Sequence, residues 1–224
     1  MNKKKQSDYL EQMEIEVWSS RQKDGATLDS VVELNQPIQT LAQLKQRVAK
    51  CELCELSKTR KNTVFGAGNE GGAKLMLVGE APGANEDEQG QPFVGRAGKL
   101  LTAMLNSVEI NREQIYIANV IKCRPPNNQV PSKTQMQLCT AYLKEQIVLV
   151  APKLLVALGR VATQFLLQTD SSMASLRGKR YLYPETKTDL LVTYHPAYLL
   201  RSPLEKRKAY EDLLLIKQTL AALD

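Results

Sequence analysis

The four cysteines of this chain of 224 residues have a spacing that suits metal binding. Cys51 and Cys54 form a CxxC pair, and Cys123 and Cys139 follow with fifteen residues between them. A chain of this length can bury enough surface to fold without disulfides, whereas four thiolates can complete a zinc site or an iron–sulfur cluster. The wide second spacing suits a cluster larger than one ion. From spacing alone, iron–sulfur and zinc both stay open, and four unrelated buried thiols are the third alternative.

Two polar side chains adjoin apolar stretches where they could do chemistry. His195 is the only histidine and directly follows the apolar run 189–194, while Asn119 lies within the apolar run 115–121. A buried amide is unfavourable unless its hydrogen bonds are satisfied, and it offers both a donor and an acceptor, as the edge of a nucleobase does. A histidine at the end of a strand can serve catalysis, although a single histidine can equally be structural.

Residues 79–98, GEAPGANEDEQGQPFVGRAG, are rich in glycine and carboxylates. They contain neither the GK[ST] of a phosphate loop nor the GxGxxG of a dinucleotide fold. The backbone here could approach a planar ligand closely. Phe93 could stack on a base, or it could simply fill the core.

Apolar runs alternate with amphipathic stretches along the chain, which predicts a three-layer α/β fold with a central, mostly parallel four-stranded sheet flanked by helices. The expected strands are 75–78, 115–121, 153–158 and 189–194, and the main expected helices are 97–105, 132–150, 161–168 and 202–220. GEAPG, Asn119, Gly159 and His195 each stand at or just beyond the end of a strand. Because ligands bind at the carboxyl ends of parallel strands, we expect these segments to converge on one site.

Residues 1–36 are polar and weakly patterned, and we interpret them as a flexible or partly helical extension of a domain spanning 37–224. The net charge of +6 is mild, but the stretch 177–208 holds eight basic residues against three acidic ones. Such a patch is typical of a nucleic-acid or phosphate binder, although chance clustering explains it as well. The sequence contains no apolar run long enough to span a membrane and no apolar secretory region, so we expect a cytoplasmic protein.

These residues together resemble the family 4 uracil-DNA glycosylases of the uracil-DNA glycosylase superfamily. The matching motifs are GEAPG with ED and QPFVGRAG downstream, NVIKCRPPNN, HPAYLLR and the four cysteines in order, over about residues 41–220. The resemblance implies a monofunctional enzyme that flips uracil out of DNA and hydrolyses its N-glycosidic bond, starting base excision repair. It also implies a [4Fe–4S] cluster on the cysteines, uracil-containing DNA (single- or double-stranded) as partner, a monomer, and a location in the prokaryotic cytosol.

The resemblance also assigns roles to individual residues. Asn119 would recognise the base edge, and His195 would donate to uracil O2. Phe93 would stack on the flipped base. The other expected uracil-pocket residues are Glu80, Ala81, Pro82 and Glu86, with Glu86 beside the position of a thymine methyl. The segment HPAYLLR would form a loop that enters the minor groove, with Tyr198, Leu199, Leu200 and Arg201 against DNA and Leu199 or Leu200 as a wedge.

One departure from the pattern concerns mechanism. The best-known branch of the superfamily carries an Asp, which positions water, where this chain has Ala81. Glu80 is the nearest candidate for a base, and we favour a dissociative mechanism in which uracil leaves before water adds. Two other functions stay open: an inactive DNA- or polymerase-binding module of the same fold, and a nucleotide- or phosphate-binding α/β enzyme.

Overall fold

The computed structural model describes residues 39–223, so the extension expected over 1–36 lies outside the described residues. Within 39–223, six strands form one sheet in the order β1-β3-β2-β4-β6-β5. The strands are β1 (Ala67–Gly68), β2 (Leu75–Gly79), β3 (Tyr116–Asn119), β4 (Leu154–Leu158), β5 (Tyr181–Leu182) and β6 (Asp189–Thr193). The four expected strands are present and pair in parallel. The expected total of four is wrong, because two short antiparallel strands, β1 and β5, edge the sheet.

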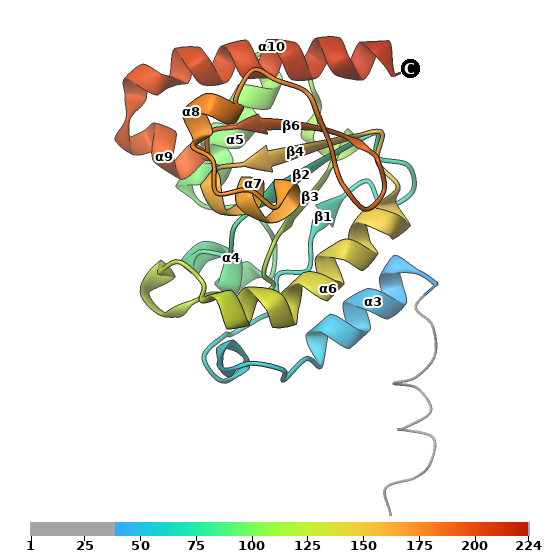
Figure 1. The fold of residues 1–224 in the computed structure, drawn as a ribbon. Coiled ribbons are helices and arrows are strands. Elements are labelled where there is room, and N and C mark those ends of the chain that lie inside the picture. Colours follow the sequence, from blue (N-terminus) through green and yellow to red (C-terminus); the bar gives the residue numbers. More distant parts are fainter. Residues whose placement is uncertain (1–38, 224) are drawn as a thin grey trace, which may run out of the picture. The chain divides into compact units, whose positions relative to one another are not determined.

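The central strands are buried on both faces, which explains their continuous apolar sequences. Leu75 and Leu77 of β2 belong to one core, and Met76 and Val78 belong to the other, because successive side chains of a strand point to opposite faces. Helices cover both faces, so the protein has the three layers that the sequence predicts (Figure 1).

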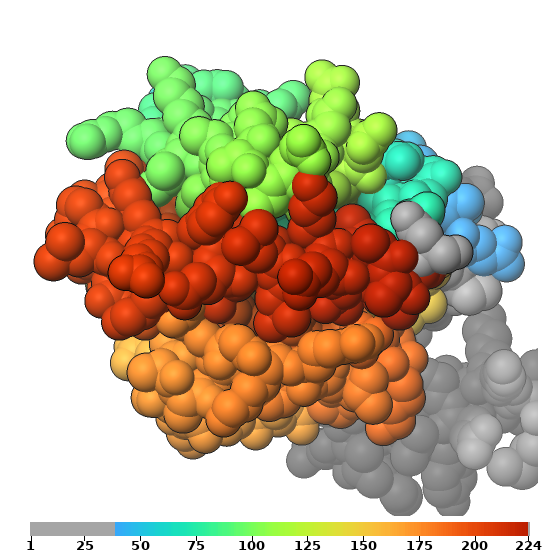
Figure 2. Space-filling view, turned by 90° about the horizontal axis from the view of Figure 1, so that it is seen from above, coloured from blue at the N-terminus to red at the C-terminus, as the bar shows by residue number. Residues whose placement is uncertain are grey.

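The helices divide between the two faces. Packed against one face are α3 (Leu41–Ala49), α6 (Lys133–Val150), α7 (Arg160–Leu167) and α8 (Met173–Leu176). Against the other lie α5 (Arg96–Asn106) and α10 (Lys206–Ala222). Figure 2 looks onto α10, which runs between the segment of α5 and the segment of α7 and α8. The short helices are α4 (Ala84–Gln89) and α9 (Pro196–Arg201), with 3-10 turns η2 (Glu55–Lys58), η3 (Arg112–Gln114), η4 (Pro126–Asn128) and η5 (Pro203–Glu205).

The order of the central strands creates a switch point beside β2. The chain passes from β2 to β3 on one side, then crosses to β4 on the other side and continues to β6. Loops that leave neighbouring strands in opposite directions open a crevice at their carboxyl ends. None of the helices described between residues 39 and 223 is both long enough and apolar enough to cross a membrane.

Candidate active site and cysteine cavity

A cleft of about 900 Å³ lies at the carboxyl ends of the central strands, where the sequence predicts a ligand site. Its size suits a small organic ligand. Among the expected site residues, the lining includes Glu80, Ala81, Pro82, Glu86, Phe93, Asn119, His195, Tyr198 and Arg201. Four segments that are distant in sequence therefore converge, as expected, on one concave surface.

Asn119 is the last residue of β3 and pairs with Gly79 of β2. Its side chain is buried, and its Oδ1 has no hydrogen-bond partner among the described residues. Such an orphaned acceptor costs about 1–3 kcal/mol unless something else binds it. Gly79 makes room for it, because a Cβ there would lie 2.4 Å from Oδ1. The amide is thus prepared for a ligand in the cleft.

Phe93 lines the cleft although it is largely buried, so it both fills the core and offers a ring surface. Its φ of 55° lies in the left-handed region, which is strained for a bulky residue. Arg112 holds this conformation by donating to the carbonyl oxygens of Pro92 and Phe93, both at 2.9 Å. This contact could not be predicted from the residue pattern. The Phe93 ring lies 5.6 Å, between centroids, from the His195 ring.

His195 follows β6 and caps the start of α9 through its Nδ1, which accepts from the Ala197 N–H at 3.1 Å. In the neutral ring the proton therefore sits on Nε2, which is left to donate to a ligand. Burial, assisted by the positive charge of Arg201 and opposed by Glu86, lowers the pKa of His195 to about 4. The imidazole is neutral at physiological pH. Gly159 (φ 85°) allows this position, because its Cβ would lie 2.7 Å from the Cβ of His195.

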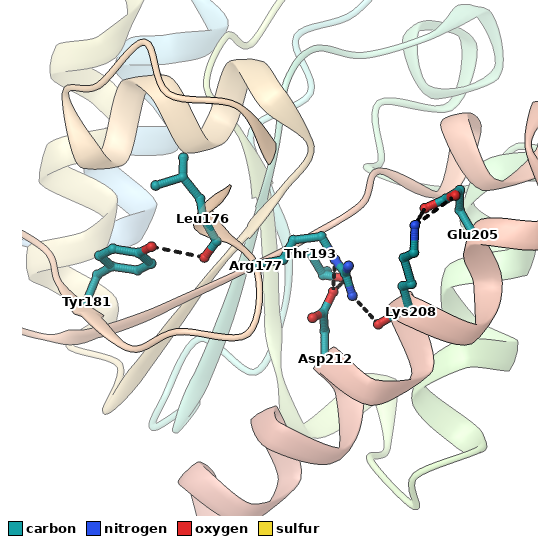
Figure 3. A network of polar contacts seen from close by, with 7 residues as sticks. All are labelled: Leu176, Arg177, Tyr181, Thr193, Glu205, Lys208 and Asp212. Carbon is teal, nitrogen blue, oxygen red and sulfur yellow. Dashed lines mark hydrogen bonds and ion pairs between the residues drawn. The ribbon is translucent and has the colours of Figure 1, made fainter. Parts of the chain in front are cut away.

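A polar network around Asp212 fixes Thr193, the last residue of β6 and two residues before His195 (Figure 3). Asp212 of α10 accepts from Thr193 at 2.8 Å and from the Arg177 Nε at 2.7 Å. The Arg177 guanidinium also lies 4.6 Å from the centre of the Tyr194 ring. In the sequence Arg177 is one of the eight basic residues of the stretch 177–208. Its charge is instead used inside the fold, next to the catalytic candidate.

The two glutamates of the first loop differ in their surroundings. Burial raises the pKa of Glu80, and the positive charge of Arg160 partly opposes the shift. Glu86 accepts from the backbone N–H groups of Val94 (3.0 Å) and Gly95 (2.9 Å). Glu86 therefore fixes the loop before α5 while it also lines the cleft.

The segment 196–201 corrects one expectation. It is the helix α9, not a loop, because Pro196 suits the first turn and His195 caps it. Leu199 is fully buried, so its expected role at the DNA surface is wrong, whereas Leu200 is 37% exposed. The sequence analysis also missed Leu204 of η5, which is 92% exposed. Figure 1 shows α9 and its connection to α10 at the edge to which β4 and β6 point.

The four cysteines line a second, separate cavity, together with Arg60, Lys122 and Tyr142. All four are free thiols. No group of three or more His, Cys, Asp or Glu within the described part of the chain is arranged to hold a metal ion. The donor set, four thiols around one space, is of a kind that can hold an iron–sulfur cluster or a zinc ion.

The surroundings of the sulfurs also suit thiolate ligands. The Arg60 guanidinium donates to the Cys123 Sγ at 3.2 Å, and the Lys122 N–H donates to the Cys139 Sγ at 3.3 Å. Burial raises the pKa of Cys123, and it raises that of Cys139 to about 11. Metal binding must therefore displace protons from these thiols.

The fold and the cleft define an α/β protein in which an amide, an aromatic ring and an imidazole line one cleft at the carboxyl ends of the strands. The family model of the uracil DNA glycosylase superfamily matches residues 65–216. The chain is 41% identical over 186 residues to a type-4 uracil-DNA glycosylase of Sulfurisphaera tokodaii, covering 80% of this chain and 84% of the relative. It is 42% identical over 160 residues to the type-4 uracil-DNA glycosylase of Thermotoga maritima, covering 71% and 82%. The chain therefore belongs to the uracil DNA glycosylase superfamily and, within it, to type 4.

Proposed function

We propose that the protein is a uracil-DNA glycosylase that flips uracil out of DNA and hydrolyses its N-glycosidic bond, the first step of base excision repair. The observation that carries the proposal is the buried, unpartnered Oδ1 of Asn119, which lies in a cleft also lined by Phe93 and His195. In such a position an amide can accept from uracil N3–H and donate to O4. Cytosine reverses both groups and would leave buried partners unpaired, which strongly disfavours it.

His195 supplies the electrostatic part of catalysis. Its neutral ring, held through Nδ1, presents Nε2–H to uracil O2, where negative charge grows as the bond to the sugar breaks. A preformed donor of this kind is worth about 10²–10³ in rate. Phe93 stacks on the base and keeps the O2 edge turned toward His195.

The water-activating step has no strong base. Ala81 stands in the position where the best-known branch of the superfamily carries an Asp. Burial raises the pKa of Glu80, which makes this carboxylate a better base, but Glu80 stands one residue before the position of that Asp. We therefore favour a dissociative path, in which uracil leaves as a stabilised anion and water then adds to the oxocarbenium-like sugar. Replacing Glu80 by Gln should slow excision no more than about tenfold, an effect on the order of one ordinary hydrogen bond. If excision were abolished while folding and uracil binding persisted, Glu80 would be the general base.

The DNA contact is assigned to α9 and the turn that follows it. Tyr198 and Arg201 line the rim of the cleft, and Leu200 is exposed beside them. We assign Arg201 to a phosphate contact, and an exposed leucine can fill the gap that a flipped base leaves in the stack. The enzyme acts as a monomer on single- or double-stranded DNA in the prokaryotic cytosol.

The cysteine cavity is assigned to a [4Fe–4S] cluster held by Cys51, Cys54, Cys123 and Cys139. When bound, the cluster supplies structure and no redox step, since hydrolysis requires none. It joins the segment after α3 to the β3–α6 connection and to α6 itself. Purified protein should be brown, with broad visible absorbance and iron in the sample. A colourless, zinc-loaded and fully active preparation would contradict the assignment.

A cleavage assay tests the function against the two rival interpretations. Labelled single-stranded oligonucleotides that differ only in one base (uracil, thymine or cytosine) are incubated with the protein and then heated in alkali. The proposed enzyme produces strand breaks only with uracil. An inactive DNA- or polymerase-binding module would shift the oligonucleotide on a native gel without breaks, and a nucleotide-binding enzyme would do neither.

A further inference from the structure

We propose that Lys122 is a positioning residue that connects the cysteine cavity to Asn119, the amide that recognises the base. The inference deepens the proposed function and rests on it. It concerns how the amide is held in place, and why a structural metal site lies on the segment that follows the base-recognising strand.

Lys122 is buried, with 1% of its surface exposed. The Nζ donates to the Asn119 backbone carbonyl at 2.8 Å and also to the Gln146 side-chain oxygen. Gln146 in turn donates to the Tyr116 hydroxyl at 3.1 Å and to the Phe65 carbonyl at 3.0 Å. The carbonyl of Asn119 therefore belongs to a buried hydrogen-bond network with Lys122 and Gln146.

The backbone of Lys122 contacts the cysteine cavity. Lys122 lines the cysteine cavity, and its N–H donates to the Cys139 Sγ. Its carbonyl accepts from the Val64 N–H at 2.8 Å, which fixes the segment from the other direction. One residue therefore contacts a cysteine with its backbone and the pocket residue Asn119 with its side chain.

Hydrogen bonds hold the buried ammonium of Lys122 in place. Its two side-chain partners in the described part of the chain are the Asn119 carbonyl and the Gln146 amide oxygen. A buried cation is costly unless its donors are satisfied, so these two acceptors keep the Nζ beside the Asn119 carbonyl.

The hydrogen bond from Lys122 fixes the backbone of Asn119 and thereby the direction of its side chain. Its side chain stands in a narrow space beside Gly79 and Phe93, and it has no side-chain partner on Oδ1 to hold it. The backbone must therefore set its direction. Removing the Lys122 donor leaves the Asn119 carbonyl buried and unpaired, which favours a rotated backbone and a displaced amide.

The test is a double-mutant cycle on single-turnover excision from a single-stranded uracil oligonucleotide, with Lys122→Met, Asn119→Ala and the double variant. We expect Lys122→Met to slow excision about tenfold in the normal background, on the order of one buried hydrogen bond, and to add less than about twofold when Asn119 is already Ala. Equal slowing in both backgrounds would overturn the inference. If Lys122→Met does not fold, the same cycle is run with Lys122→Gln, which keeps an N–H donor and loses the charge, and smaller slowing with the same non-additivity is expected.

Arg60→Met is the matched control, because Arg60 also donates to a cysteine sulfur but does not touch Asn119. Arg60→Met removes a side-chain donor to a sulfur, so it should shorten the lifetime of the visible absorbance in the presence of a chelator and lower the iron content. Lys122→Met keeps its backbone N–H on the Cys139 Sγ and should do neither. Only Lys122→Met should slow the iron-replete enzyme. Equal slowing by Arg60→Met would show that the effect runs through the metal site alone and would overturn the positioning role. Absence of uracil excision by the unaltered protein would instead refute the proposed function.

Discussion

Replacing Gly79 by Ala perturbs the site at its tightest point. The new Cβ would lie 2.4 Å from the Asn119 Oδ1 and 2.7 Å from the Phe93 Cζ, whereas ordinary contacts begin at 3.4 Å. Asn119 must therefore move by about 1 Å, a displacement that can cost about 100-fold in rate. That factor corresponds to about 2.7 kcal/mol of transition-state stabilisation. Gly79 itself does not have a left-handed φ, so the backbone accepts alanine without strain.

The assay is single-turnover excision from a single-stranded uracil oligonucleotide, with thermal unfolding measured on the same samples. Gly71→Ala is the matched control, because its Cβ would meet only a side-chain oxygen at 4.0 Å. We expect Gly79→Ala to lose about 100-fold in rate while it unfolds as one cooperative transition, and Gly71→Ala to behave as the unaltered protein. A Gly79→Ala enzyme within about threefold of the original rate would refute the fixed position of the amide.

The remaining predictions concern protonation and the DNA surface. Because the pKa of His195 is lowered from 6.5 to about 4, excision should be flat between about pH 5 and 8; an acidic loss centred near 6.5 would contradict a neutral imidazole. The same shift makes the His195 contribution to stability complete above pH 6.5 and progressively lost as the pH falls toward 4, which denaturant unfolding across that window measures. Leu204→Ala and Leu200→Ala should reduce excision from duplex DNA about tenfold and leave single-stranded excision within about twofold, because only a duplex must be held open. Leu182→Ala, which replaces an exposed leucine of β5, serves as the control. Equal effects of the two variants on both substrates would exclude a wedge.

The central strands could be predicted from the sequence because each is a buried apolar run followed by an unusual residue. Asn119 and His195 stood out for the same reason: each is a polar group where the pattern calls for burial. The two-residue strands β1 and β5 could not be predicted, because two residues carry no periodicity. Their pairing depends on β3 and β6, which are distant in sequence.

The contacts that hold the site residues in place could not be predicted from the sequence either, because they also join residues that are distant in sequence. Lys122 lies in NVIKC and looks like a surface lysine at the end of a strand, and only the fold shows that it is buried and bonded to Gln146. Arg112 holds Phe93 from 19 residues away. The helix over 196–201 was missed because six residues are too few for a helical pattern, and this error placed Leu199 on the surface instead of in the core.

The most direct measurement is the ratio of single-turnover excision rates for uracil and cytosine in the same single-stranded sequence, with the unaltered protein and with Asn119→Ala. The unaltered protein should release uracil and no measurable cytosine. Asn119→Ala should lose most uracil excision, while its cytosine rate does not fall further, so the ratio collapses. A ratio that survives loss of the Asn119 amide would contradict base recognition by this residue.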